Sequence, residues 1–174
     1  MSIKQTQGRE GAAPRKQEVI TKNTFRRKAA ENSEVSQAYS FLPQTDRPMH
    51  ELTGMEKIEV VRRGLTKQDL EQVKESFGLD YETLAKVLSV AKATLFNKKG
   101  TERFSSSLSE KIFALADLYS YGFSVFESKE LFNAWMEQEN RALGNIRPFE
   151  LLDTMIGVAE VKNIIGRIEH GVYS

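Results

Sequence analysis

From about residue 50 onward, apolar residues recur at the three- and four-residue spacing of amphipathic helices, and no useful run alternates in the way of a half-buried strand. The pattern therefore predicts an all-α fold. Before about residue 48 the chain is polar and carries three of its four prolines. The expected helices span residues 66–77, 80–88, about 91–98, about 107–121, a segment that begins at Ser128, 148–157, and about 158–169.

Polar and glycine residues mark the ends of these segments. Thr66 with Asp69 is typical of a capping box at a helix start, and Ser107 with Glu110 predicts a second one. Ser128 and Pro148 suit the first turns of two later helices. Glycines that follow apolar runs are predicted helix stops, and in the C-terminal part they are expected to need positive φ. These C-terminal stops are Gly144, Gly157 and Gly171.

The same spacing predicts which side chains are buried. In the first four helices these are Leu70, Val73, Phe77, Leu84, Val87, Leu88, Leu95, Leu108, Ile112, Leu115, Ala116 and Tyr119. In the C-terminal part they are Leu131, Phe132, Trp135, Met136, Leu143, Leu151, Leu152, Ile156, Val161, Ile164, Ile165 and Ile168.

Two short helices joined by only three residues, 89–91, predict a helix-turn-helix within residues 79–100. The small residue Ala85 stands where the helices cross, and the apolar residue Val90 lies in the turn. Ala91 is a poor N-cap for the second helix. The outward side chains of that helix suit base edges and phosphates, or else form an ordinary solvated face. They are Lys92, Ala93, Thr94, Asn97, Lys98 and Lys99.

Charge separates the N-terminal region from the rest. The chain has 174 residues and a formal net charge of +1, but residues 1–30 hold eight basic and two acidic side chains. We interpret residues 1–49 as a flexible basic extension, whose alternative is a solvated tail without a role. No apolar leader and no apolar run of membrane length is visible, so a cytoplasmic protein is expected.

The composition leaves little room for catalysis. There is no cysteine, and the two histidines cannot make a histidine-rich metal site. No glycine-rich phosphate loop occurs, and His170 beside Glu169 is better interpreted as a cation at a helix end than as part of a triad. The expectation is a protein that is not an enzyme and needs no cofactor or metal.

The C-terminal segment carries a dense run of family motifs. In order, it shows Trp135, Asn140-x-Ala-Leu-Gly, Pro148-x-x-Leu-Leu-Asp-Thr, Gly157, and a Val/Ile helix that ends in Ile168-x-x-Gly-Val. This order resembles the toxin-binding domain of Xre/MbcA/ParS antitoxins, and with the helix-turn-helix it covers about residues 60–174. One departure is Glu139, where family members often have proline.

The resemblance implies a function. Family members are antitoxins whose toxins carry a RES domain, which is similar to ADP-ribosyltransferases and uses NAD. The antitoxin covers the NAD pocket of the toxin and represses the shared promoter. Exposed polar residues and the terminal tail are the candidate toxin contacts here, with a frayed end as the alternative for the tail. They are Asn140, Arg141, Asn145, Arg147, His170, Gly171, Val172, Tyr173 and Ser174.

We therefore expect a helix-turn-helix domain at 50–122 and a toxin-binding domain at 123–174. The expected partners are a cognate RES-domain toxin, operator DNA and a second copy of the chain, but no membrane. Candidate dimer contacts are Phe41, Leu42, Phe123 and Phe126. Two alternatives remain: a dimeric transcriptional repressor with no toxin partner, and a protein-binding adaptor with a decayed helix-turn-helix.

Overall fold

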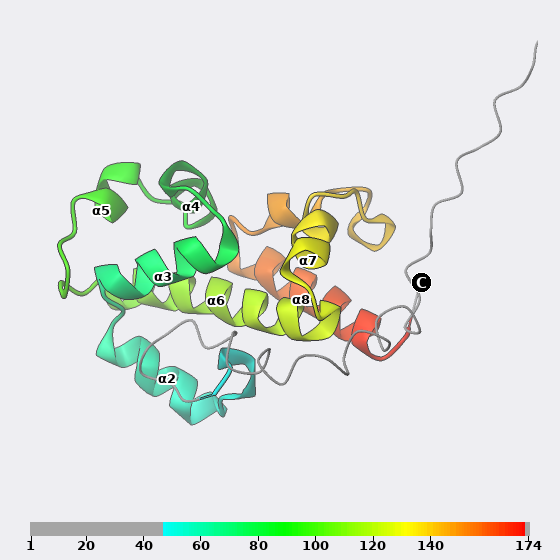
Figure 1. Ribbon diagram of the computed structural model, residues 1–174, viewed down its shortest axis with the longest axis horizontal. Helices are drawn as coiled ribbons and strands as arrows, with labels where there is room; N and C mark the ends of the chain where they lie inside the picture. Colours follow the sequence, from blue (N-terminus) through cyan, green and yellow to red (C-terminus); the bar gives the residue numbers. More distant parts are fainter. Residues whose placement is uncertain (1–46, 173–174) are drawn as a thin grey trace, which may run out of the picture.

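The computed structural model describes residues 47–172, and this part of the chain is helical, with no β-strand (Figure 1). The predicted all-α fold is confirmed. Two isolated β-bridges, Thr66 with Arg103 and Asn140 with Ile146, only close loops. The elements are η2 (Met49–Glu51), α2 (Gly54–Arg63), α3 (Lys67–Phe77), α4 (Tyr81–Val87), α5 (Lys92–Phe96), α6 (Ser106–Phe126), α7 (Lys129–Met136), η3 (Arg141–Leu143), η4 (Pro148–Leu151) and α8 (Met155–Glu169).

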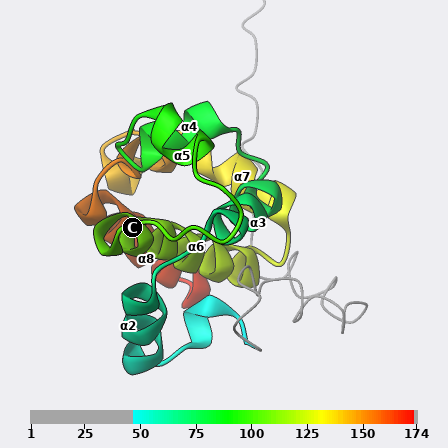
Figure 2. The same ribbon diagram turned by 90° about the vertical axis from the view of Figure 1, so that its left-hand side faces the viewer.

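The long helix α6 lies at the centre of the molecule. It contacts η2, α2 and α3 from the first half of the chain and α7 and α8 from the second half. Figure 2 shows α2 and the α4–α5 pair on opposite sides of α6. A 21-residue helix that is buried on several sides is apolar almost all round, which is the composition that such a position requires.

Most of the predicted caps are present. The Thr66 side chain and the Asp69 carboxylate close a capping box at α3, and Gly78 ends that helix with φ +70°. Asp80 and Ser128 cap α4 and α7.

The predicted start and end of the long helix are wrong. Ser105, and not Ser107, accepts the hydrogen bond from the Leu108 amide, so α6 begins at Ser106. The helix continues past Tyr121 to Phe126 because the buried stripe persists through Gly122 and Phe123, and Glu127 then ends it at φ 54°.

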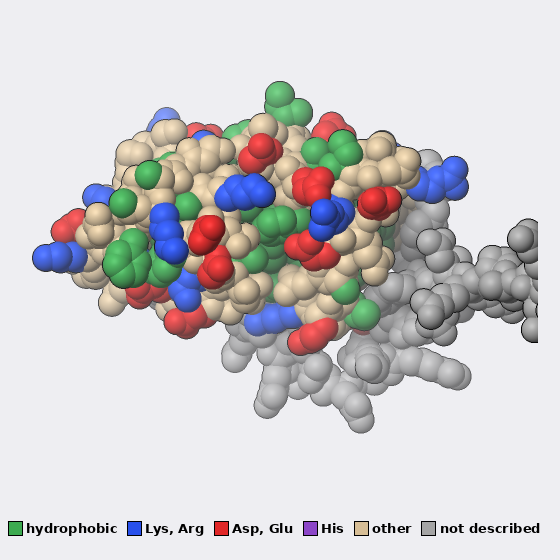
Figure 3. Space-filling model, turned by 90° about the horizontal axis from the view of Figure 1, so that it is seen from above, with side chains coloured by type: hydrophobic (Ala, Val, Ile, Leu, Met, Phe, Trp, Pro, Cys, Tyr) green, Lys and Arg blue, Asp and Glu red, His purple; other side chains and the backbone are tan. Residues whose placement is uncertain are grey.

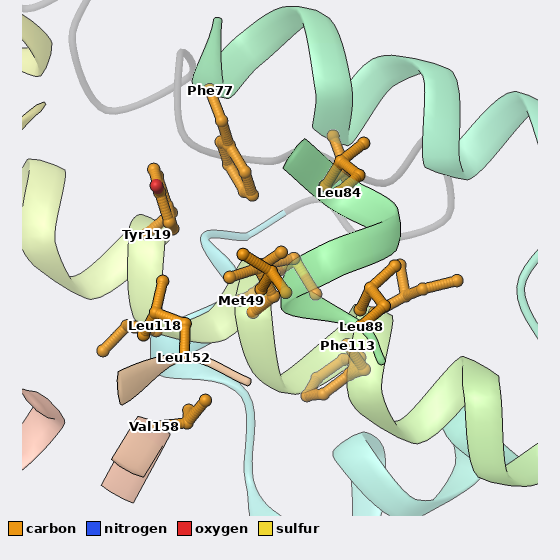
Figure 4. Close-up of a cluster of buried hydrophobic side chains, with 14 of the residues drawn as sticks. Met49, Phe77, Leu84, Leu88, Phe113, Leu118, Tyr119, Leu152 and Val158 are labelled. Atoms are coloured by element: carbon orange, nitrogen blue, oxygen red, sulfur yellow. The ribbon is translucent and has the colours of Figure 1, made fainter. Parts of the chain in front are cut away.

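One hydrophobic core joins both halves of the chain. In Figure 4, Leu152 lies beside Leu118, and Leu152 and Val158 belong to the same cluster of buried side chains as Phe77 and Tyr119. The rings of Phe77 and Tyr119 stack with centroids 4.0 Å apart. Most of the predicted core residues are indeed buried.

The prediction that Phe123 and Phe126 are exposed dimer contacts is wrong. Both side chains are buried, and each packs against the ring of Phe132. The other two candidates, Phe41 and Leu42, lie outside the described residues.

Three predictions for the C-terminal part need correction. Gly157 is not a helix stop: Thr154 caps α8, and Gly157 is a buried residue inside its first turn, without positive φ. The side chains of Ile156 and Leu131 are exposed and not in the core. The error at Ile156 follows from the misplaced helix start, which hid that this residue lies off the stripe of Val158, Val161 and Ile165. Gly144 and Gly171 do have positive φ, as expected.

Candidate functional site

Helices α4 and α5 form a tight helix-turn-helix. The turn closes through hydrogen bonds from the Ser89 amide to the Lys86 carbonyl, 3.1 Å, and from the Val90 amide to the Ala85 carbonyl, 2.9 Å. Ser89 takes the left-handed conformation, φ 54°, that this turn requires. Ala91 precedes α5 without a side-chain cap, as predicted. The buried joint consists of Leu84, Ala85, Leu88 and Leu95.

The outer face of α5 carries the residues that the sequence singled out. Lys92, Ala93, Thr94, Asn97 and Lys99 are exposed. Lys98 is partly buried, because its ammonium donates to the Arg103 carbonyl at 2.8 Å. Two of the lysines lie near carboxylates, Lys92 at 3.8 Å from Glu82 and Lys98 at 3.9 Å from Glu102.

The charge over this part of the surface is mixed but leans positive. Residues 81–104 contain five basic and two acidic side chains. Figure 3 shows Lys and Arg side chains next to Asp and Glu side chains and to apolar patches at the end of the molecule where α4 and α5 lie. Such a surface attracts a negatively charged partner.

A buried lysine holds α5 in place, and the sequence analysis did not find it. Lys67 begins α3, and its ammonium donates to the Leu95 carbonyl at 2.7 Å. The same ammonium lies 4.0 Å from the centroid of the Tyr81 ring. Burial lowers the pKa of Lys67, while the nearby carboxylate of Glu71 raises it. A lysine at a first helical turn is usually solvated, so the sequence carries no signal for this contact.

The helix-turn-helix also contacts the C-terminal half directly. The Ser89 hydroxyl donates to the Asp153 carbonyl at 2.9 Å. Within the first half, the Lys111 ammonium of α6 donates to the Leu88 carbonyl at 3.1 Å. Leu152 and Val158 line a small cavity at this junction. The turn between α4 and α5 therefore rests on the loop that leads into α8.

The polar candidates between α7 and η4 shape their own loop. The Asn140 side chain accepts the Ala142 amide at 2.9 Å, and Asn145 turns the chain at φ 61°. Arg147 pairs with Glu150 at 2.8 Å and with Glu137 at 3.7 Å. Arg141 is exposed at the start of η3. These residues border the surface, but the side chains of Asn140 and Arg147 also have structural partners.

The other candidate toxin contacts lie at the C-terminal end of α8. His170 follows the helix, Gly171 turns at φ +70°, and Val172 is exposed. Tyr173 and Ser174 lie outside the described residues. At the opposite end of α8, Met155 and Ile156 are exposed, Ile156 to 78%. The sequence analysis missed this pair.

Within residues 47–172, no three His, Asp or Glu side chains are grouped so that they could hold a metal ion. In the same range, no helix is both long enough and apolar enough to cross a membrane.

Each half of the chain matches a known domain family. Residues 56–117 match the antitoxin Xre-like helix-turn-helix domain. Residues 122–171 match the C-terminal toxin-binding domain of the Xre/MbcA/ParS antitoxins. The two matches together cover more than half of the chain, and they meet inside α6. The chain belongs to the Xre/MbcA/ParS antitoxin family. It is a type II antitoxin with a helix-turn-helix domain, as the resemblance implied.

Three relatives illustrate the breadth of this antitoxin family. The Prs ADP-ribosylating antitoxin of Sphingobium sp. (strain YBL2) is 27% identical over 143 residues, which is 76% of this chain and 89% of the relative. Antitoxin Xre of Photorhabdus laumondii is 34% identical over 76 residues, or 43% of this chain. Antitoxin Xre of Yersinia enterocolitica is 36% identical over 73 residues, or 41% of this chain. These two matches span 51% and 49% of the relatives' length.

Proposed function

We propose that this antitoxin neutralises a RES-domain toxin by covering its NAD site and represses its own operon through α5. The observation that carries the proposal is the combination on one chain of a tight helix-turn-helix with a cationic outer face and a segment that matches a toxin-binding domain. The relative named a Prs ADP-ribosylating antitoxin supports a partner that uses NAD.

On the toxin side, the proposed contact surface combines the predicted polar residues with the apolar pair at the start of α8. Exposed apolar side chains next to polar ones are typical of the centre of a protein interface. Met155 and Ile156 supply such side chains inside the matched toxin-binding segment. Asn140, Arg141, Asn145, Arg147 and the tail from His170 to Ser174 are proposed as the remaining contacts.

On the DNA side, α5 enters the major groove, and Lys92, Asn97 and Lys99 contact base edges and phosphates. Ala93 and Thr94 approach the groove, and Lys98 reaches a phosphate after leaving the Arg103 carbonyl. Because these contacts are few, one copy should bind DNA weakly. We therefore propose that two copies bind two half-sites. Affinity for the promoter should fall steeply with salt, because each neutralised phosphate releases counterions.

The test is co-expression with the product of the adjacent gene, followed by an assay of NAD consumption with and without the antitoxin. We expect the two proteins to co-purify and the antitoxin to abolish NAD consumption. Ile156→Glu should weaken neutralisation at least tenfold, because it places a charge in a desolvated contact. Met55→Glu is the matched control, since Met55 is similarly exposed, to 72%, on α2 in the other half of the chain.

A variant that lacks residues 171–174 tests the tail. It should keep the fold and lose neutralisation. Full protection by this variant would contradict occlusion by the tail. If the adjacent product neither binds this protein nor consumes NAD, while the promoter is still bound, the chain is a transcriptional repressor and the toxin part of the proposal fails.

A further inference from the structure

Phe96, the last residue of α5, is an exposed aromatic residue on the outer surface of the helix-turn-helix. Its side chain is 63% exposed, although its neighbour Leu95 is fully buried. Exposed apolar side chains are common on protein surfaces, so exposure alone carries no function. Two further observations, the fixed position of the ring and the charges around it, give this exposure a meaning.

Two neighbouring side chains position the Phe96 ring. The ring of Tyr81 meets it edge to face, with centroids 5.9 Å apart and an interplanar angle of 88°. The buried Lys67 ammonium lies 5.8 Å from its centroid. Tyr81 is itself fixed, because its hydroxyl donates to Glu71 at 3.1 Å. The ring is therefore positioned by its neighbours, and its free face is presented to whatever approaches α5.

The groups around that free face select the kind of partner. Lys92 and Ala93 precede Phe96 by four and three residues, so their side chains share its side of the helix. Asn97 and Lys99 follow Phe96 by one and three residues and are exposed. A partner that meets this face must combine negative charge with a small apolar group. Duplex DNA does so in its major groove, where phosphates border the C5 methyl group of thymine.

We propose that Phe96 contacts the methyl group of a thymine in each operator half-site and so determines sequence specificity. This inference rests on the proposed binding of DNA by α5. Lysine and asparagine read hydrogen-bonding groups, whereas Phe96 distinguishes thymine from cytosine and uracil by apolar contact. Burial of one methyl group corresponds to about a fourfold change in affinity.

The test uses duplexes that cover the region upstream of this protein's own gene, with the bound segment located by footprinting. Single thymines are then replaced by deoxyuridine, which removes only the methyl group. We expect the full-length protein to lose affinity about fourfold at one thymine in each half-site. Phe96→Ala should bind the normal duplex more weakly and show no further loss with deoxyuridine at that position.

Two control variants separate apolar reading from charge and from folding. Lys99→Ala should reduce the slope of log affinity against log salt concentration by about the contribution of one phosphate contact, and it should keep the sensitivity to deoxyuridine. Phe96→Leu should keep part of the sensitivity, because leucine still offers an apolar surface. Both Phe96 variants should have the circular dichroism spectrum of the wild type, since the side chain lies outside the core.

The outcomes distinguish this inference from the function on which it rests. If the wild type binds the duplex but no deoxyuridine substitution matters, or if Phe96→Ala keeps the sensitivity, the role of Phe96 is overturned and DNA binding stands. A preference for single-stranded DNA that depends on Phe96 would indicate base stacking instead and would also overturn it. No binding to the upstream duplex would overturn both.

Discussion

At Gly157, the third residue of α8, the chain has no room for a side chain. A Cβ atom there would lie 1.8 Å from the carbonyl oxygen of Leu151, which belongs to the backbone of η4. Backbone cannot move aside as the end of a flexible side chain can. The contact fixes the first turn of α8 against η4 and so sets the position of Met155 and Ile156.

Gly157→Ala should therefore lower stability by about 1–3 kcal/mol or more, because it forces η4 and α8 apart. Thermal or urea unfolding followed by circular dichroism measures this loss. Gly54→Ala is the control: Gly54 begins α2, and its added Cβ would meet nothing within 4 Å. An unchanged unfolding midpoint in Gly157→Ala would show that the close approach is relieved at little cost.

At this scale the sequence predicts well where the cause of a structure is local. Thr66 and Ser128 cap helices as expected, since a cap depends on the next three residues. Three consecutive serines at 105–107 are all competent caps, and the sequence alone did not identify Ser105. The role of Gly157 was predicted wrongly because glycine is required there by the Leu151 carbonyl of another element, η4, and not by the neighbouring sequence.

At the scale of elements, the recognition helix α5 is short and depends on its neighbours. Five residues form too little helix to be stable alone. The Lys67 ammonium donates to the Leu95 carbonyl at the C-terminal end of α5. The Gln68 amide donates to the Gly100 carbonyl, at 3.3 Å, just beyond the end of α5. The position of α5 is thus set largely by the start of α3.

Lys67→Met should loosen α5 while it leaves the rest of the fold intact. We expect faster amide hydrogen exchange at Leu95–Gly100. We also expect about tenfold weaker binding to the promoter, because ordering a mobile helix on binding costs conformational entropy. Lys74→Met is the control, because Lys74 also lies beside Tyr81, 5.5 Å from its ring centroid, but on a later turn of α3. Equal exchange rates in both variants would contradict the role of Lys67.

Most of the helices were predictable, but α2 (Gly54–Arg63) was not expected, and the helix expected over 148–157 is only the short η4 (Pro148–Leu151) followed by the start of α8. The faces that the helices expose were less predictable. Apolar spacing located α3, α4, α6 and α7, because their buried stripes are long enough to define a face. In α5 and at the start of α8 only two or three positions decide the face. Phe96 and Ile156 stand beside buried neighbours there, and only the tertiary structure shows that they point outward.

At the scale of the whole molecule, one carboxylate joins three helices. Asp117 of α6 accepts a hydrogen bond from the Lys57 ammonium of α2 at 2.7 Å and another from the Lys162 ammonium of α8. Asp117 is buried, and both lysines are partly exposed. Residues from the two matched domains thus share one counter-ion, a relation that sequence spacing cannot reveal.

Asp117→Asn should lower the free energy of unfolding by about 1–3 kcal/mol, because two ammonium groups lose their common negative partner. Urea unfolding measures this change. The substitution should destabilise both halves together. The double variant Asp117→Asn with Lys162→Gln should recover part of the loss. Asp153→Asn, at an exposed carboxylate, serves as the control. Equal unfolding curves for the wild type and Asp117→Asn would rule out this bridge as a source of stability.

The shared helix α6 has a consequence for the lifetime of the protein in a cell. Its buried side chains belong at once to the helix-turn-helix domain and to the toxin-binding domain, so neither domain keeps a complete core without it. A protease that cuts anywhere in α6 therefore destroys both activities in one event. Under the proposed function, degradation of a single chain would start new transcription of the operon at the moment when it frees an active toxin.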